Sequence, residues 1–160
     1  MPEDWPADST FDESSWSNLR EDNPNMSTYN RSKTMAEKAA WDFQTALPEA
    51  ERFEIVTINP ALIMGPSYLT GDFASGQVMR GIMTSGEKCS RTRMGMVDVR
   101  DTAMAHLLAV TKEDARNRRF LLVSKCAWRK DMAACLAAEF NSKGFSINAE
   151  EATDGSVLDY

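Results

Sequence analysis

The sequence is poor in the residues that bind metals or cross-link a chain. It has three cysteines and one histidine in 160 residues, at Cys89, Cys126, Cys135 and His106. An odd number of cysteines without Cys-x-x-Cys spacing predicts neither a zinc site nor a disulfide framework. Free thiols are typical of a reducing compartment, so we expect a cytoplasmic protein without a metal, in which Cys126 and Cys135 are small buried residues.

Long apolar stretches and an excess of positive charge are also absent. No apolar run approaches the roughly 18 residues of a membrane span, and the acidic start, Met1 to Pro6, is unlike a signal peptide. The net charge of −6 argues against nucleic acid and an anionic membrane surface as partners. A hydrophobic content of 42% and a charged content of 26% are ordinary for one globular domain with its own core.

What the sequence does contain is an alternation of helical and strand-like segments. The pattern predicts helices over residues 28–47, 74–84, 102–110 and 128–140, and strands over residues 53–58, 94–99, 120–124 and 145–147. This order is typical of an α/β fold with a parallel sheet. Only two or three of these strands are convincing, which is too few for a complete doubly wound sheet. We therefore expect an incomplete one.

Local chemistry refines the boundaries of these elements. Pro60 cannot donate a hydrogen bond to a sheet and should end the first strand, which leaves residues 61–66 as a buried loop. Asp101 should cap the third helix, and the apolar run 120–124 is typical of a strand buried in a sheet. The acidic tail over residues 148–160 should be frayed.

The first 25 residues predict an irregular surface segment. They are rich in Pro, Asp, Glu, Ser and Asn, a composition typical of turns and loops. Three aromatic side chains, Trp5, Phe11 and Trp16, should pin this segment to the rest of the domain.

Tyr29 and Lys33 stand four residues apart at the start of the first predicted helix, for which Ser27 is a suitable N-cap. Residues at this spacing share one helix face. A nearby cation favours a phenolate over a phenol, and a phenol tuned in this way can exchange a proton with a carbonyl oxygen near neutral pH. The same face carries small or apolar residues that we expect to pack on a sheet: Ala36, Ala40, Phe43 and Leu47.

One such pair arises readily by chance, so its neighbours decide its meaning. Four motifs occur in a fixed order: Phe11-Asp12-Glu13 with Trp16, Tyr29-x-x-x-Lys33 with Ala36 to Trp41, Asn59-Pro60-Ala61 with Gly65-Pro66, and Val97 to Asp101 with Ala105-His106. With these motifs the chain resembles the extended short-chain dehydrogenase/reductases, in particular the branch of dihydroflavonol reductases and cinnamoyl-CoA reductases.

The resemblance implies a Rossmann-like, doubly wound parallel sheet that is incomplete here and is followed by a substrate-binding part. Residues 1–66 would end the dinucleotide-binding core, and residues 67–160 would form the substrate-binding part. The implied activity is the NADPH- or NADH-dependent reduction of a small aldehyde or ketone. Tyr29 would be the general acid, and Lys33 would bind the nicotinamide ribose and tune Tyr29. The loop that would contact the nicotinamide consists of Pro60, Ala61, Leu62 and Ile63.

Two features of the family have no counterpart among these residues. The family holds the cofactor pyrophosphate with a Gly-x-x-Gly-x-x-Gly turn, and none of the eight glycines has that spacing. The catalytic serine of the family lies on a strand, whereas Ser9, Ser14 and Ser15 lie in the acidic segment and receive no assignment. We therefore expect the chain to correspond to roughly the second half of such an enzyme.

Two alternatives remain open at this point. The chain could be catalytically silent, either as a truncated product or as an interaction module that self-associates or pairs with a separate nucleotide-binding half. It could also be an epimerase or dehydratase of the same superfamily, which shares the Tyr-x-x-x-Lys motif. The run from Ala36 to Trp41 disfavours that second alternative.

Overall fold

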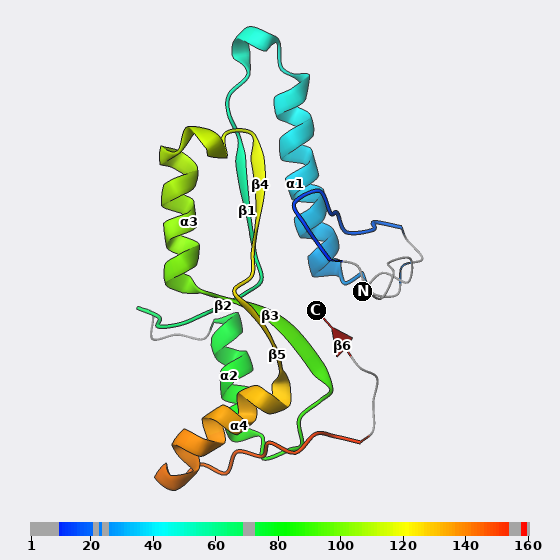
Figure 1. Cartoon of the computed structure of the whole chain (residues 1–160). Coiled ribbons are helices and arrows are strands. Elements are labelled where there is room, and N and C mark those ends of the chain that lie inside the picture. Colours follow the sequence, from blue (N-terminus) through cyan, green and yellow to red (C-terminus); the bar gives the residue numbers. More distant parts are fainter. Residues whose placement is uncertain (1–9, 21–22, 24–25, 69–72, 154–157, 160) are drawn as a thin grey trace. The chain divides into compact units, whose positions relative to one another are not determined.

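The computed structural model describes residues 10–20, 23, 26–68, 73–153 and 158–159. The chain divides into two compact units (Figure 1). The first unit consists of Met1–Asn59 and Ala105–Leu121, and the second of Pro60–Met104 and Leu122–Tyr160. This is a division by packing, and the functional division into residues 1–66 and 67–160 stays a prediction.

Helices and strands alternate along the chain, so the predicted α/β class is confirmed. The α-helices are α1 (Thr28–Ala46), α2 (Ala74–Thr84), α3 (Val99–Thr111) and α4 (Arg129–Phe140). The strands are β1 (Val56–Pro60), β2 (Leu62–Met64), β3 (Thr92–Asp98), β4 (Arg118–Leu122), β5 (Lys125–Trp128) and β6 (Leu158–Asp159). Short 3-10 turns cover Glu49–Glu51, Glu113–Ala115 and Asn141–Lys143.

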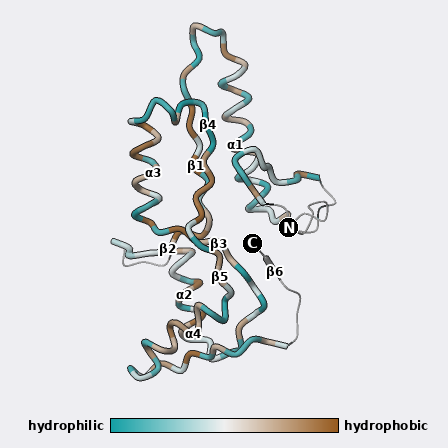
Figure 2. The backbone as a smooth tube through the Cα atoms, viewed as in Figure 1, coloured by the Kyte–Doolittle hydropathy of each residue, from teal (hydrophilic) through white to brown (hydrophobic). Residues whose placement is uncertain are grey.

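The first unit is built around the pair of strands β1 and β4, with α1 on one side and α3 on the other (Figure 1). Successive residues of β1 point to opposite faces, as strand geometry requires. The side chains of Thr57 and Asn59 donate hydrogen bonds to Glu37 of α1. Val56 and Ile58 instead line a cavity beside α3. Figure 2 shows hydrophobic residues on β1 and on α3, and the apolar side chains of β1 that line the cavity face this helix.

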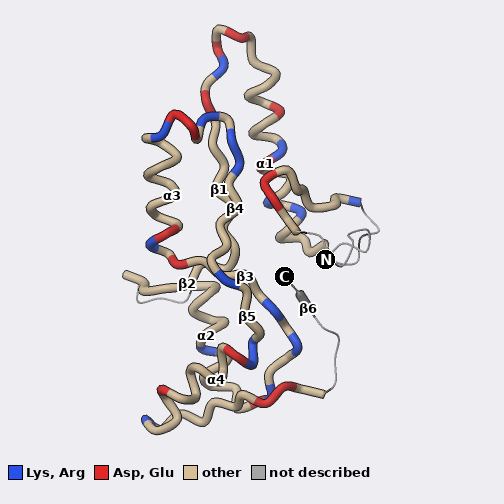
Figure 3. The backbone as a smooth tube through the Cα atoms, viewed as in Figure 1, with Lys and Arg blue, Asp and Glu red and all other residues tan. Residues whose placement is uncertain are grey.

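Helix α1 begins as predicted but buries a different face. The Ser27 hydroxyl accepts a hydrogen bond of 3.0 Å from the Asn30 backbone N–H, which confirms the N-cap, and the helix ends at Ala46. The predicted apolar face is wrong, because Ala36 and Phe43 are exposed. Figure 3 shows basic residues on β4, and one of them, Arg119, pairs with Glu37 of this helix.

A turn between α3 and β4 fixes the start of β1. Among the described residues other than glycine, Asn117 alone has a positive φ, of 54°. Asparagine tolerates this left-handed conformation better than most residues. Its side-chain oxygen accepts a hydrogen bond of 3.2 Å from the Ile55 backbone N–H, so the turn also caps the strand entry.

The second unit is a sheet centred on β3. Strand β2 pairs parallel with the end of β3, β6 pairs parallel with its start, and β5 pairs antiparallel with it. Met96 pairs with both β2 and β5, and Arg93 pairs with both β5 and β6. Because a strand has two edges, β2 and β6 share one edge of β3 and β5 takes the other.

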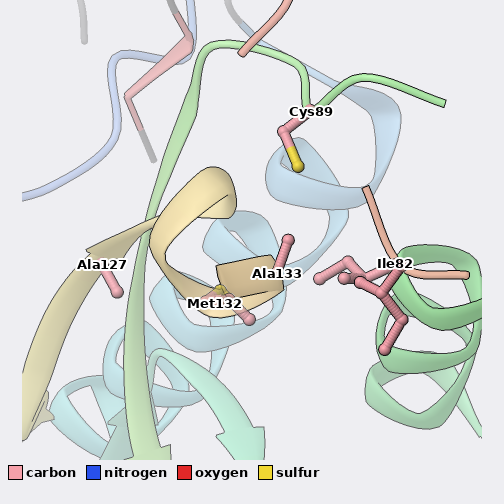
Figure 4. Packing of buried hydrophobic residues seen from close by; sticks show 6 residues of the cluster. Ile82, Cys89, Ala127, Met132 and Ala133 are labelled. Atoms are coloured by element: carbon pink, nitrogen blue, oxygen red, sulfur yellow. The ribbon is translucent and has the colours of Figure 1, made fainter. Parts of the chain in front are cut away.

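The main hydrophobic cluster lies in the second unit, where α2 and α4 pack near the sheet. Figure 4 shows its buried residues from close by, and Ala133 of α4 has no exposed surface. The helical periodicity of residues 74–84 predicts that Val78, Met79, Ile82 and Met83 face inward. This face of α2 is confirmed, since Ile82 is buried and the other three pack against the cluster. The buried members are Ile82, Cys89, Ala127, Met132, Ala133 and Ile147.

Several local boundaries differ from the prediction. Strand β1 continues through Pro60, and residues 62–64 form strand β2 instead of a loop, because β3 supplies a parallel partner for them. Helix α3 starts at Val99, not after Asp101. The carboxylate at its start belongs to Asp98, whose Oδ1 accepts the Arg100 backbone N–H at 2.8 Å.

The C-terminal part also differs from the prediction. The apolar run 120–124 is not fully buried, residues 145–147 form no strand, and β5 was not predicted. Residues 148–153 are not frayed, because they are hydrogen-bonded to Cys89. The Cys89 backbone N–H donates to the Glu150 carbonyl at 2.7 Å, and the Cys89 carbonyl accepts from the Ala152 N–H at 2.8 Å. Cys126 and Cys135, expected to be buried, are exposed.

We predict that Gly65→Ala destabilises the second unit more than Gly144→Ala does. Both glycines have a positive φ, at 132° and 95°, where alanine is strained. A Cβ on Gly65 would also lie 2.8 Å from Cγ1 of Val99, whereas one on Gly144 meets nothing within 4 Å. We expect losses of about 2–4 kcal/mol for Gly65→Ala and about 1–2 kcal/mol for Gly144→Ala in urea unfolding. Equal losses would contradict the steric role of Val99.

Candidate active site

Tyr29 and Lys33 lie side by side in the first two turns of α1. The Lys33 ammonium is 5.4 Å from the centroid of the Tyr29 ring. The tyrosine is 68% exposed and the lysine is exposed as well, so both polar groups are open to an incoming molecule. The phenol and the amine therefore share one open helix surface.

The other predicted site residues lie in the second unit. Pro60 is exposed at the end of β1, and the Ala61 backbone N–H donates to the Leu122 carbonyl at 3.0 Å. Leu62 and Ile63 belong to β2 and pair with β3. The backbone of this segment is therefore held by its neighbours within the second unit.

A carboxylate that had no functional prediction of its own lies at the centre of the first unit. Glu37, with a side chain only 13% exposed, accepts hydrogen bonds at Oε1 from Arg119 Nε at 2.8 Å and Thr57 Oγ1 at 2.8 Å. Asn59 Nδ2 and Trp41 Nε1 approach the same oxygen at 3.3 and 3.4 Å, and Arg119 Nη2 donates to Oε2 at 3.2 Å. The sequence signal for this residue is its place one turn beyond Lys33 on the same side of the helix.

These contacts control the ionisation of Glu37. Burial alone would raise the pKa of this carboxyl group. The hydrogen bonds from Arg119, Thr57 and Asn59, together with the charge of Arg119, outweigh burial and lower the pKa from 4.5 to about 2. Glu37 is therefore a structural carboxylate that stays ionised, unlike a general acid.

The acidic segment before α1 is held through its backbone and through Trp16. The Arg119 guanidinium lies 3.7 Å from the Trp16 ring centroid, and Lys38 lies 5.1 Å from it. Arg119 also donates to the Ser15 carbonyl at 3.0 Å. Trp16 thus pins the segment as predicted, whereas Phe11 is exposed and Trp5 lies outside the described residues.

The serines of this segment serve its own turn. Ser14 Oγ donates to Asp12 Oδ1 at 2.6 Å and Ser15 Oγ donates to the same oxygen at 3.1 Å. The bonds from Ser14 and Ser15 lower the pKa of Asp12. Both hydroxyls are engaged with Asp12, which is consistent with leaving both serines unassigned, and Ser9 lies outside the described residues.

A separate cavity of about 460 Å³ lies between β1 and α3 of the first unit. Val56, Ile58 and His106 line it, and the rim carries charges of both signs. Neither Tyr29 nor Lys33 borders it. In the described part of the chain, no cluster of three or more His, Cys, Asp or Glu side chains could hold a metal ion. Among the same residues, none of the helices combines the length and the apolar character of a membrane span.

We predict that Glu37→Gln lowers the free energy of unfolding by about 3 kcal/mol at pH 7, because a pKa displaced from 4.5 to about 2 corresponds to that amount. The folded-state pKa lies below the unfolded one, so the carboxylate stabilises the fold fully above pH 4.5. That contribution is lost as the pH falls from 4.5 toward 2. Urea unfolding at several pH values would measure both effects.

The control is Glu139→Gln, which changes an exposed glutamate that pairs with Lys143 on the surface of α4. Surface pairs contribute about 0–1 kcal/mol, so this variant should unfold nearly as the parent does. If Glu37→Gln matched the control at pH 7, the carboxylate would have no structural role.

Similarity to known proteins is found over most of the chain. No family model matches the sequence. The NADPH-dependent methylglyoxal reductase GRE2 of Saccharomyces cerevisiae is 29% identical over 142 residues, which cover 82% of this chain and 41% of that protein. Cinnamoyl-CoA reductase 1 of Arabidopsis thaliana is 31% identical over 134 residues, covering 83% of this chain and 38% of the relative.

Solved structures agree with the sequence similarity. The yeast methylglyoxal/isovaleraldehyde reductase Gre2, determined in complex with NADPH, superposes with a TM-score of 0.74 at 26% identity. The match covers 92% of this chain and 47% of that one, so the chain spans less than half the length of these relatives. The chain therefore belongs to the extended short-chain dehydrogenase/reductases, in the branch of the dihydroflavonol and cinnamoyl-CoA reductases.

Proposed function

We propose that these residues form the part of an NADPH-dependent carbonyl reductase that carries the proton donor. The observation that supports this most is the pairing of Tyr29 with Lys33 on one open helix face, in a chain related to NADPH-dependent reductases. The substrate class is a small aldehyde or ketone, as for the named relatives. NADPH is favoured over NADH because relatives are named for it.

The residues present fit part of such a cofactor site. The exposed Lys33 ammonium has three donors for ribose hydroxyls, and the Tyr29 hydroxyl is free to reach a carbonyl oxygen. Pro60, Ala61, Leu62 and Ile63 would contact the nicotinamide through side chains and carbonyls, since the Ala61 N–H is already engaged.

The chemistry divides between the cofactor and the chain. NADPH, when bound, supplies the hydride for the carbonyl carbon. Tyr29 donates its hydroxyl proton to the carbonyl oxygen, so that the product leaves as an alcohol. Lys33 binds the ribose. By doing so it keeps the proton donor at a fixed distance from the carbonyl group.

We further propose that the 160-residue chain by itself does not bind the cofactor tightly. A pyrophosphate is held by backbone N–H groups at a helix N-terminus after a glycine-rich turn, and the glycines here lack that spacing. We predict that titration of the purified chain with NADPH or NADH, followed by nucleotide fluorescence, shows no saturation. Stoichiometric binding with a micromolar Kd would contradict this.

The second candidate is a catalytically silent protein that pairs with a nucleotide-binding half or with itself. Its support is the small apolar core of the first unit, where Ala115 is the one buried hydrophobic residue among those described. A partner that covers further apolar surface would stabilise such a unit. An epimerase or dehydratase reading has less support, because the relatives reported above are reductases.

A fusion protein separates these candidates. We predict that the nucleotide-binding half of the yeast methylglyoxal reductase, joined before residue 1, gives a protein that oxidises NADPH in the presence of methylglyoxal. Tyr29→Phe should lower kcat by about 100-fold or more, as expected when a general acid is lost. Tyr68→Phe, which changes an exposed tyrosine of the second unit, is the matched control and should leave kcat unchanged. A fusion that binds NADPH but keeps its activity after Tyr29→Phe would refute the assignment.

A further inference from the structure

Arg119 of β4 gathers three kinds of partner on one guanidinium: a carboxylate, backbone carbonyls and an aromatic ring. It binds both oxygens of Glu37, donates to the Ser15 carbonyl, and stacks on the Trp16 ring at 3.7 Å. It also donates to the Glu13 carbonyl. The side chain is only 18% exposed, so these contacts form with little competition from water.

The neighbouring Arg118 provides an internal comparison. Successive residues of a strand point to opposite faces. Arg118 is exposed, lies over the Phe120 ring at 5.2 Å and donates to the Asp114 carbonyl at 3.4 Å. Arg118 is therefore the same type of residue on the same strand as Arg119, but it makes none of the contacts that Arg119 makes to α1 and to the acidic segment.

The contacts of Arg119 reach the helix that carries the proposed proton donor. Glu37 lies one turn beyond Lys33 and two turns beyond Tyr29, on the same side of α1. The same carboxylate binds Thr57 and Asn59 of β1. The position of α1 along β1 therefore depends on the carboxylate that Arg119 neutralises.

The acidic segment is held at its other end from within α1. Arg31, which lies between Tyr29 and Lys33, donates to the carbonyls of Leu19 and Arg20 at 3.0 and 3.2 Å. Two guanidinium groups, one on β4 and one on α1, thus hold the backbone of the segment beside the helix. The planar fork of arginine suits this role, because it can serve a carboxylate, a carbonyl and an aromatic ring at once.

We propose that Arg119 is a positioning residue of the reductase site: it locks Glu37 of the Tyr29–Lys33 helix and the segment around Trp16 into one cluster on β1 and β4. This inference rests on the proposed function, because the position of the helix matters for catalysis only if Tyr29 is the proton donor. A misplacement of about 1 Å can cost about 100-fold in rate. Arg119 acts through Glu37 and does not itself touch the substrate.

The first test uses the 160-residue chain and nuclear magnetic resonance. The Trp16 indole N–H signal, assigned with Trp16→Phe, and the pH titration of the Glu37 carboxyl carbon are followed in the parent, Arg119→Lys and Arg118→Lys. Lysine keeps the charge but loses the fork and the planar stacking surface. We expect Arg119→Lys to move the indole signal toward that of an exposed tryptophan and to raise the Glu37 pKa from about 2 toward 4.5. Arg118→Lys should change neither. If Arg119→Lys changed neither signal, the cluster would not depend on Arg119 and the proposal would fail.

The second test uses the fusion protein and separates positioning from plain stability. We expect Arg119→Lys to lower kcat by about 10-fold or more with KM for methylglyoxal within about twofold, since only the transition state uses the position of Tyr29. Equal activity of Arg119→Lys and Arg118→Lys would overturn the positioning role. A parent fusion without activity would instead count against the proposed function, and the spectra of the chain alone would still decide whether Arg119 organises the cluster.

Discussion

The first unit depends on one ionised carboxylate, that of Glu37, surrounded by hydrogen-bond donors. Few apolar side chains are fully buried there, and Thr34 is the one buried residue of α1. The helix is therefore attached to β1 and β4 mainly through polar contacts, which are directional where apolar contacts are not. A directional attachment fixes the orientation of the helix turns that carry Tyr29 and Lys33.

The two units are stabilised by different physical means. In the second unit, α2, α4 and the sheet bury an apolar cluster rich in methionine and alanine, with Ala133 fully enclosed. Methionine fills irregular gaps and tolerates changes of shape, which suits a cluster assembled from two helices and a sheet. The first unit is held together instead by hydrogen bonds among a few polar side chains.

The sequence predicted the features that arise within one segment. The Ser27 cap, the extent of α1 and α2, and the inward face of α2 depend on neighbouring residues only, and all three are confirmed. Features that depend on distant partners were missed. The three residues of β2 become a strand because β3 lies beside them, and the partners of Glu37 lie 20 and 82 residues away. The Tyr29–Lys33 pairing could be predicted because it is local to one helix, whereas the group that anchors that helix could not.

The attachment of residues 148–153 to Cys89 has a consequence for how the protein forms during synthesis. The backbone of Cys89 pairs with Glu150 and Ala152, and its thiol lies 3.4 Å from the Asn148 carbonyl, 59 residues along the chain. Such a long closure is entropically costly and is made late. A nascent chain that has emerged only as far as α4 would still lack this edge, so we expect the second unit to mature only after residues 148–153 have left the ribosome.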